Sequence, residues 1–206
     1  MVITGTTSGI GLKTTRALFA TGATLFLTAR DMKKAETALI GILEPGHILL
    51  VEMDNSSFTS IRAAAATILT QSNNQVNILV NNAGVMRIEN VKLTEDGHEM
   101  HFATNHLGHF LLFQLLKSAL LSCSTPDFHS SVVTVASSAH RTWNLNESDN
   151  YNFQKGGYHY GPAYANSKLA NVYMANELDR LSGYKGLHAR SLHQHCHNPD
   201  PFDPII

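Results

Sequence analysis

Short apolar segments alternate along this chain with longer segments of helical periodicity, and this alternation limits the folds open to it more than any other feature. Several of the short segments are apolar along nearly their whole length, as strands buried on both faces of a sheet are. The segments predicted as strands are residues 2–4, 24–29, 47–53, 76–80, 131–137 and 186–193, and those predicted as helices are residues 10–21, 31–43, 56–72, 96–121 and 161–181. This order predicts an α/β fold with a doubly wound parallel sheet of about six strands.

The composition limits the partners and the location of the protein. A chain of 206 residues suits one α/β domain. Its formal net charge of −1 gives no basic surface for nucleic acid. Two cysteines make no disulfide framework, which favours a reducing compartment. The longest apolar stretch, near residues 107–121, is too short and too polar to span a membrane, and no signal peptide is recognised, so the cytoplasm is the default location.

A glycine-rich turn, VITGTTSGIG at residues 2–11, joins the first predicted strand to the first predicted helix. Glycines at positions 5, 9 and 11 let the backbone turn sharply and approach a pyrophosphate, which the amino end of the helix would bind. The spacing differs from the common dinucleotide fingerprint, so a nucleotide site and a bare tight turn both remain open at this point. A nucleotide site here would make the sheet Rossmann-like.

The end of the second predicted strand bears on the choice of nucleotide. NAD sites place an acidic residue near this position, where Ala29 stands here. Arg30 follows and could bind a 2′-phosphate, which favours NADP over NAD. The alternative is that Arg30 is a solvated charge that pairs with Asp31. Asp54 follows the third strand, where an adenine would lie, although a lone aspartate there is more often a helix cap.

Five motifs give the chain a resemblance to a known family. They are TGTTSGIG at 4–11, NNAG at 81–84, TNHLGHF at 104–110, VTVASS at 133–138 and YANSK at 164–168. In this order and spacing they resemble the short-chain dehydrogenase/reductase family over about residues 1–193. TAR, NHLGHF and YANSKLANV are most similar to its retinol-dehydrogenase-like branch, which includes the WW-domain oxidoreductases.

The resemblance implies a role for each matching residue. The cofactor loop would consist of Gly5, Thr6, Ser8, Gly9, Ile10 and Gly11. The adenine would lie between Asp54 and Asn55, and the path to the nicotinamide ribose would be lined by Asn81, Ala83 and Gly84. The catalytic tetrad would be Asn105, Ser138, Tyr164 and Lys168. In the family, the asparagine holds a water of a proton relay, and a local kink in the helix around Asn105 would allow this.

The chemistry of alcohol oxidation explains why Tyr164 and Lys168 stand four residues apart. A free tyrosine has a pKa of about 10, too high for an efficient base near neutrality. Residues four apart share one face of a helix, and a lysine ammonium there favours the phenolate. Tyr164 is therefore the predicted general acid/base, with Lys168 activating it and reaching the cofactor ribose, and Ser138 orienting the substrate oxygen.

Both ends of the chain depart from the family pattern. The first predicted strand is a stub. After residue 193 the sequence has no Pro-Gly clasp, substrate lid or seventh strand. We therefore interpret residues 194–206 as a divergent tail of a truncated domain 1–193. An open pocket would exclude water less well. His193, His195, Cys196 and His197 are clustered there, but they lack a spaced second ligand pair, and we expect no metal site.

Two functional hypotheses remain. The complete tetrad favours an NADP-dependent oxidoreductase that interconverts an alcohol and a carbonyl in a small, apolar substrate. The missing clasp, lid and strand favour a catalytically impaired module that binds a nucleotide or a partner without turnover. A methyltransferase would share the glycine turn but explains neither Tyr164 and Lys168 nor NNAG. A homodimer through the helices that carry Asn105 and Tyr164 is possible, as the family resemblance implies.

Overall fold

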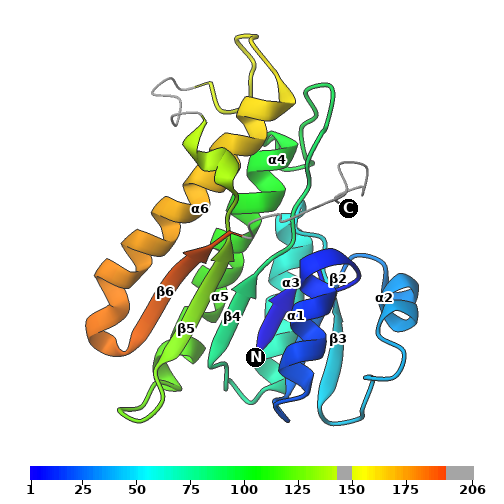
Figure 1. Cartoon of the computed structure of the whole chain (residues 1–206), viewed down its shortest axis with the longest axis vertical. Coiled ribbons are helices and arrows are strands. Elements are labelled where there is room, and N and C mark those ends of the chain that lie inside the picture. The colour runs from blue at the N-terminus through cyan, green and yellow to red at the C-terminus, as the bar shows by residue number, and fades with distance from the viewer. Residues whose placement is uncertain (143–149, 194–206) are drawn as a thin grey trace.

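The computed structural model describes residues 1–142 and 150–193, and its centre is a single parallel sheet (Figure 1). The six strands are β1 (Val2–Thr4), β2 (Leu25–Ala29), β3 (Ile48–Glu52), β4 (Ile78–Asn81), β5 (Ser130–Val135) and β6 (Leu187–Leu192). Their order across the sheet is β3-β2-β1-β4-β5-β6. The predicted doubly wound α/β fold of about six strands is therefore confirmed.

Helical segments connect these strands, and several of them are short. They are α1 (Gly9–Phe19), α2 (Met32–Ala38), α3 (Phe58–Gln71), α4 (Met100–Phe102), the π-helix η1 (Ala103–Leu107), α5 (Gly108–Ser122), the 3₁₀-helix η2 (Ser138–Arg141), α6 (Tyr160–Ser182) and the 3₁₀-helix η3 (Gly183–Lys185). The segments α4, η1 and α5 follow one another directly, so they form one long helical region. The short π-helix η1, called the π-turn below, lies within it.

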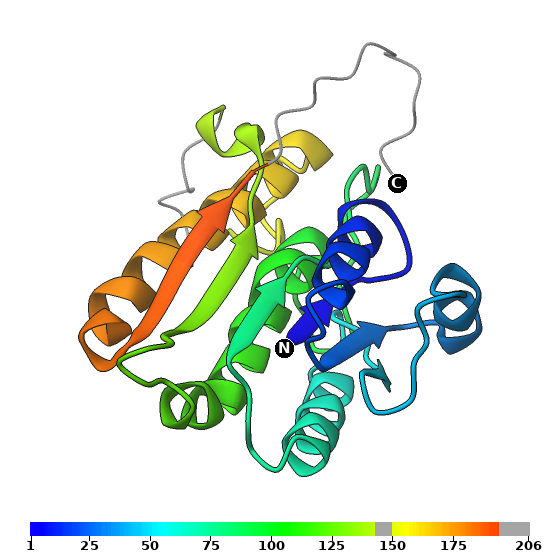
Figure 2. The same ribbon diagram turned by 60° about the horizontal axis from the view of Figure 1, so that its bottom comes forward.

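Helices cover both faces of the sheet at β1 and β2, and these strands are apolar because both of their faces are buried. Val2 and Leu79 belong to the core formed with α3, α5 and α6. The neighbouring residues Ile3 and Val80 point the other way, into the core formed with α1 and α2. Figure 2 shows α1 in front of β1 near the middle of the sheet, with no described helix in front of β5 and β6.

The strand order reverses between β1 and β4, and this reversal positions the site. Thr4 of β1 pairs with Thr28 of β2, and Ile3 pairs with Val80 of β4. Because all these strands are parallel, the residues that follow them meet at the same carboxyl edge. Open α/β sheets bind their ligands at this kind of switch point.

Three predicted helix boundaries were wrong. Asn55 or Ser56 was expected to cap the third helix, but the Ser57 side chain accepts from the Ser60 N–H and is the cap. The Asp54 carboxylate instead accepts from the Ser56 N–H at 2.8 Å, which closes a turn before the helix. The second helix ends at Ala38, and the helix expected from residue 96 begins at Met100, because residues before it form a bridged turn.

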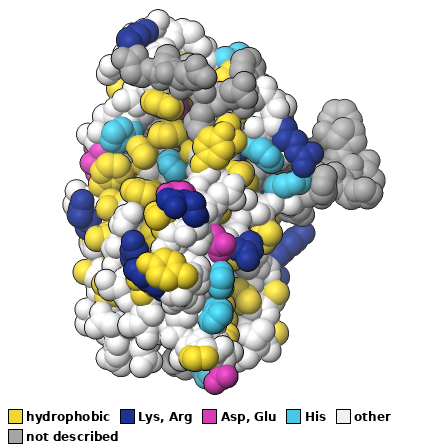
Figure 3. All heavy atoms as spheres, turned by 90° about the vertical axis from the view of Figure 1, so that its left-hand side faces the viewer, with side chains coloured by type: hydrophobic (Ala, Val, Ile, Leu, Met, Phe, Trp, Pro, Cys, Tyr) yellow, Lys and Arg dark blue, Asp and Glu magenta, His cyan; other side chains and the backbone are white. Residues whose placement is uncertain are grey.

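Hydrophobic side chains gather on the outer surface beside α6, in the upper half of the face shown in Figure 3. On α5 and α6, Phe110, Tyr173 and Leu181 are exposed large hydrophobic residues. These are the helices through which a homodimer was predicted, and that assembly stays a prediction. No helix within the described ranges is long and apolar enough to cross a membrane.

Candidate active site

The glycine loop after β1 is packed tightly against the segment after β4. Gly5 has a φ of +67°, and a Cβ there would lie 2.7 Å from the Ala83 Cα. A Cβ on Gly11 would lie 2.1 Å from the Gly5 carbonyl oxygen. Only glycine fits either position, because one needs a left-handed backbone and both lack space.

Asn82, which the sequence analysis did not single out, fastens these two segments together. Its Nδ2 donates to the carbonyl oxygens of Thr4 at 2.8 Å and Gly5 at 3.0 Å. The Thr4 hydroxyl oxygen accepts from the backbone N–H groups of Asn82 and Ala83, each at 2.9 Å. The NNAG motif pointed to this segment, but the sequence does not show which of its two asparagines faces the glycine loop.

The surroundings of the loop fit a dinucleotide cofactor. The α1 helix begins at Gly9, and the Ser8 side chain makes no capping hydrogen bond, so the amino end of the helix faces outward with its N–H groups available. Gly9 and Ile10 are exposed there. The amide of Asn81 is buried at the end of β4, and neither of its polar atoms has a partner among the described residues. A buried amide of this kind is usually satisfied by a ligand or by water.

The residues predicted to contact the adenosine half of the cofactor differ in how deeply they are buried. Arg30 is exposed at the end of β2, and the Asp31 Oδ1 accepts from the Lys34 N–H as the cap of α2. Thr6 is fully buried, with its hydroxyl near the Thr28 carbonyl. Asn55 is also buried, and its Nδ2 donates to the Thr104 carbonyl of the π-turn at 3.2 Å.

Tyr164 and Lys168 lie one turn apart on α6, and their contacts match the predicted pairing. The Lys168 Nζ lies 5.7 Å from the centre of the Tyr164 ring and donates to the Val135 carbonyl at 2.9 Å. Lys168 is only 4% exposed. Burial lowers the pKa of Lys168 to about 8, so the side chain is still cationic at pH 7. A cation beside the phenol favours the phenolate.

Asn105 lies in the π-turn and is fully buried. Its Oδ1 accepts from the Val85 N–H at 2.7 Å, and its Nδ2 donates to the Val85 carbonyl and to the Ser167 hydroxyl. A Cβ on Gly84 would lie 3.1 Å from that Oδ1 and 3.5 Å from the Lys168 Nζ. Asn105 therefore joins the segment after β4 to the helix that carries Tyr164 and Lys168.

Ser138 begins the 3₁₀-helix that follows β5, where it is exposed. The neighbouring Ser137 accepts from the Ala139 N–H and caps this helix, which leaves Ser138 as the hydroxyl without a capping role. Because β5 pairs with β4, Ser138 belongs to the same carboxyl edge as Asn81. The predicted tetrad residues thus come from three neighbouring elements: Asn105 from η1, Ser138 from η2, and Tyr164 and Lys168 from α6.

A buried carboxylate–imidazole pair beside Tyr164 was missed by the sequence analysis. Glu99 and His101 are almost completely buried, and the Glu99 Oε1 lies 2.7 Å from the His101 Nδ1. The His101 ring stands edge-on to the Tyr164 ring, with centres 6.3 Å apart. The periodicity of this segment gave no sign of the pairing.

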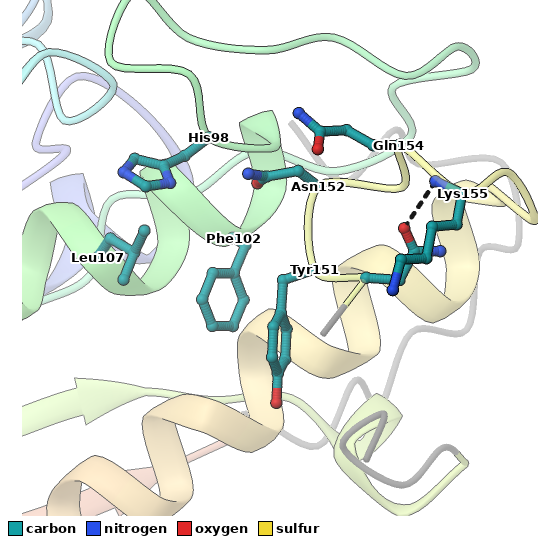
Figure 4. Close-up of a pocket in the computed structure, with 8 residues that line it drawn as sticks. His98, Phe102, Leu107, Tyr151, Asn152, Gln154 and Lys155 are labelled. Atoms are coloured by element: carbon teal, nitrogen blue, oxygen red, sulfur yellow. Dashed lines mark hydrogen bonds between the residues drawn. The ribbon is translucent and has the colours of Figure 1, made fainter. Parts of the chain in front are cut away.

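The loop at residues 150–155, which precedes α6, forms one wall of a cavity (Figure 4). The cavity has a volume of about 350 Å³, and it is lined by His98, Phe102, Leu107, Asn150, Tyr151, Asn152, Gln154 and Lys155. The Phe102 and Tyr151 rings stack with centres 5.4 Å apart. The Asn152 Oδ1 accepts from the Glu99 N–H, which ties this loop to α4. Residues 143–149 lie outside the described part.

No group of three potential metal ligands occurs in the part of the chain that the structure describes. His195, Cys196 and His197 of the predicted tail lie outside it. The Cys123 thiol is free.

Comparisons with known proteins place the fold and the motifs in a family. A family model described as short chain dehydrogenase matches residues 1–193. Short-chain dehydrogenase/reductase prx1 from Penicillium rubens is 48% identical over 191 residues, which are 93% of this chain and 55% of that protein. Human retinol dehydrogenase 13 is 39% identical over 196 residues, 94% of this chain and 57% of that protein. A crystal structure of an uncharacterised protein from Mycobacterium paratuberculosis matches with a TM-score of 0.80 and 36% identity, over 96% of this chain and 68% of that one.

The chain therefore belongs to the short-chain dehydrogenase family, a family of oxidoreductases that bind nicotinamide cofactors, and it is a retinol-dehydrogenase-like member. It spans about half the length of the curated relatives that it matches.

Proposed function

We propose that this chain carries the cofactor site and the catalytic residues of an NADP-dependent oxidoreductase that interconverts an alcohol and a carbonyl. The observation that carries the proposal is the buried Lys168 ammonium beside the Tyr164 ring, at the edge of the sheet where the glycine loop lies. A site for nucleotide binding alone has no need of a buried cation under a phenol.

The bound dinucleotide would supply or accept the hydride. Gly5, Gly9 and Gly11 would hold its pyrophosphate against the amino end of α1. Tyr164 would move the proton on the substrate oxygen, with the cationic Lys168 favouring its phenolate. Ser138, exposed at the same edge, would donate a hydrogen bond to that oxygen.

The proposed preference for NADP rests on Arg30. Arg30 is exposed and lies two positions after Thr28, which pairs with Thr4 of β1. It therefore lies at the same carboxyl edge of the sheet as the glycine loop. Its guanidinium could bind a 2′-phosphate there by a charge-assisted contact. Ala29 is 5% exposed and offers no acceptor for a ribose hydroxyl.

The proposed substrate is a small, apolar alcohol or carbonyl compound. Phe102 and Tyr151 give the cavity described above a flat aromatic wall. The loop that carries Tyr151 is tied to α4 next to His101, which contacts Tyr164. Changes in this loop would therefore alter substrate choice.

The test is a fluorescence titration with NADPH and with NADH, followed by turnover assays with apolar aldehydes and alcohols. We expect tight NADPH binding, weaker NADH binding and measurable turnover. In Tyr164→Phe, we expect turnover to fall by about 10²–10⁴-fold while NADPH affinity changes little. Binding without turnover in the parent protein would support the catalytically impaired module instead. Folded protein that binds neither cofactor would refute the proposed oxidoreductase and leave only the impaired module that binds a partner.

A further inference from the structure

The contacts of the buried Glu99–His101 pair fix where the proton of the imidazole lies. The Glu99 Oε1 lies 2.7 Å from the His101 Nδ1, and the Ile88 N–H faces the other ring nitrogen, Nε2, at 3.4 Å. A backbone N–H can only donate, so the Nε2 carries no proton. A neutral imidazole has one N–H, which must then be the Nδ1–H that donates to Glu99.

The Glu99 carboxylate selects this tautomer. Its second oxygen, Oε2, accepts from the Phe102 N–H at 2.8 Å, which caps the first turn of α4. Both carboxylate oxygens therefore face donors, and an ionised carboxylate is a group that accepts at both positions. The partner of one ring nitrogen decides which nitrogen carries the proton. Through the ring, Glu99 thus makes the His101 Nε2 an acceptor for Ile88.

The segment after β4 is held from two sides at Ile88. Its N–H faces His101, and its carbonyl accepts from the Tyr158 hydroxyl at 2.5 Å. Burial raises the pKa of Tyr158 to about 12, so this hydroxyl keeps its proton at neutral pH. Arg87, the residue before Ile88, has a φ of +59°, a left-handed conformation that is unfavourable for a residue with a side chain. Such a conformation persists where neighbouring contacts hold it.

The same segment begins beside the predicted tetrad. A Cβ on Gly84 would lie 3.5 Å from the Lys168 Nζ, and both backbone polar groups of Val85 are bonded to the Asn105 side chain. Residues 84–88 therefore lead from the Lys168 ammonium to the His101 ring.

His101 is also in contact with the proposed general acid/base. Its ring and the Tyr164 ring meet at an angle of 74° with centres 6.3 Å apart, an edge-on geometry that aromatic pairs favour. His101 is fully buried and Glu99 is 1% exposed, so neither side chain lies where a substrate could reach it. One imidazole thus supports both the segment after β4 and the phenol of Tyr164.

Building on the proposed function, we propose that Glu99 and His101 are positioning residues for Tyr164. The carboxylate holds the imidazole in its Nδ1–H tautomer, and the imidazole holds Ile88. Fixed in this way, the His101 ring sets the angle at which the Tyr164 phenol meets the substrate oxygen.

The isosteric variant Glu99→Gln tests the choice of tautomer. Glutamine offers one acceptor and one donor where the carboxylate offers two acceptors. The Phe102 N–H cannot change its role, whereas an imidazole can move its proton, so we expect the amide oxygen to face Phe102 and the amide nitrogen to face His101. The ring proton then moves to Nε2, where it meets the Ile88 N–H and breaks that contact.

We expect kcat in Glu99→Gln to fall by about 10–100-fold, because Tyr164 loses its alignment, while NADPH affinity stays unchanged. If this variant does not fold, His101→Asn makes the same comparison: its amide can still donate to Glu99, but it lacks the ring and cannot reach Ile88. The exposed Glu89→Gln, next to Ile88, is the matched control and should leave kcat unchanged. A folded Glu99→Gln that is less stable but has the kcat of the parent protein would show a purely structural role and overturn the proposal.

A measurement without turnover keeps this proposal separate from the proposed function. The tautomer of His101 can be read by NMR from its two ¹⁵N ring signals, assigned by their loss in His101→Asn. The ring signals of Tyr164, assigned with Tyr164→Phe, report its orientation. In Glu99→Gln we expect the ring proton of His101 on Nε2 and shifted Tyr164 signals, with neither change in Glu89→Gln.

Two results of the NMR measurement would refute the positioning role whether or not the protein is active. One is a ring proton that stays on the His101 Nδ1 in Glu99→Gln, and the other is a moved proton with unchanged Tyr164 signals. Both expected changes in a parent protein without turnover would support the positioning role and refute only the proposed activity.

Discussion

Lys168 destabilises the fold at a position where we propose that it serves catalysis. Moving a lysine ammonium out of water is unfavourable, and here one carbonyl and the face of one ring replace the water. The pKa of Lys168 falls from 10.5 to about 8 on folding. At pH 7 the side chain is charged in both states, so the folded state bears a cost on the order of 3 kcal/mol.

We expect Lys168→Met to unfold at higher urea concentration than the parent protein at pH 7. The gain should be about 2 kcal/mol, because the hydrogen bond to Val135 is lost along with the buried charge. Between pH 8 and 10.5 the folded protein sheds this proton before the unfolded chain does, so the advantage of the methionine variant should shrink over that range. A variant less stable than the parent at pH 7 would contradict this account.

Arg30 allows a second prediction for a single residue. Replacing it by serine removes a charge-assisted contact to a 2′-phosphate, and NADPH affinity should fall by about 10–100-fold. NADH affinity should stay within about twofold, because NADH lacks that phosphate. Arg62→Ser, at an exposed position on α3, is the control. Equal losses for both cofactors in Arg30→Ser would show that Arg30 does not select between them.

The elements differ in how far the sequence predicts them. The strands were predicted because burial on both faces leaves an apolar run that is visible locally. The π-turn was not, because distant contacts hold it: a Cβ on Gly108 would lie 2.4 Å from the Asn55 carbonyl, and the Asn55 amide donates to Thr104. The family resemblance implied a kink around Asn105, but not its form. The predicted roles of the tetrad residues remain predictions.

The packing of the glycine loop against the segment after β4 allows a prediction about stability and cofactor binding. Gly5→Ala should destabilise the protein by about 3 kcal/mol and abolish NADPH binding, since its φ is +67° and its Cβ would overlap Ala83. Gly22→Ala is the matched control, because Gly22 has a φ of +74° with nothing within 4 Å of its Cβ. It should cost only about 1 kcal/mol, which is the backbone strain alone. Equal losses of stability in urea unfolding would mean that the contact with Ala83 is unimportant.

Across the whole molecule, the cofactor loop and the proposed catalytic helix are joined through buried polar contacts. The contacts run from Thr4 through His109 to Asn105, and from Asn105 through Asn171 to α6. A ligand seated on the glycine loop should therefore stabilise the sheet, the π-turn and α6 together. This coupling can be read from the unfolding of the entire chain.

NADPH at one hundred times its dissociation constant should stabilise the folded protein by about 2.7 kcal/mol. For a chain of this length, that corresponds to a rise in Tm of roughly 5–10 °C. Thermal unfolding followed by circular dichroism should show one transition that moves as a whole. NADH at the same concentration should raise the Tm less, and Gly5→Ala should show no rise. A shift confined to part of the transition would mean that the loop and α6 unfold independently.

The position of β1 between β2 and β4 has a consequence for the order of events in folding. This strand has three residues, and its Ile3 pairs on one side with Leu27 and on the other with Val80. The second pairing requires closure of a long segment that contains β3 and α3, and such distant pairings slow the search for the native state. The middle of the sheet is thus among the last parts to close, and we expect stopped-flow refolding in milliseconds to seconds instead of microseconds.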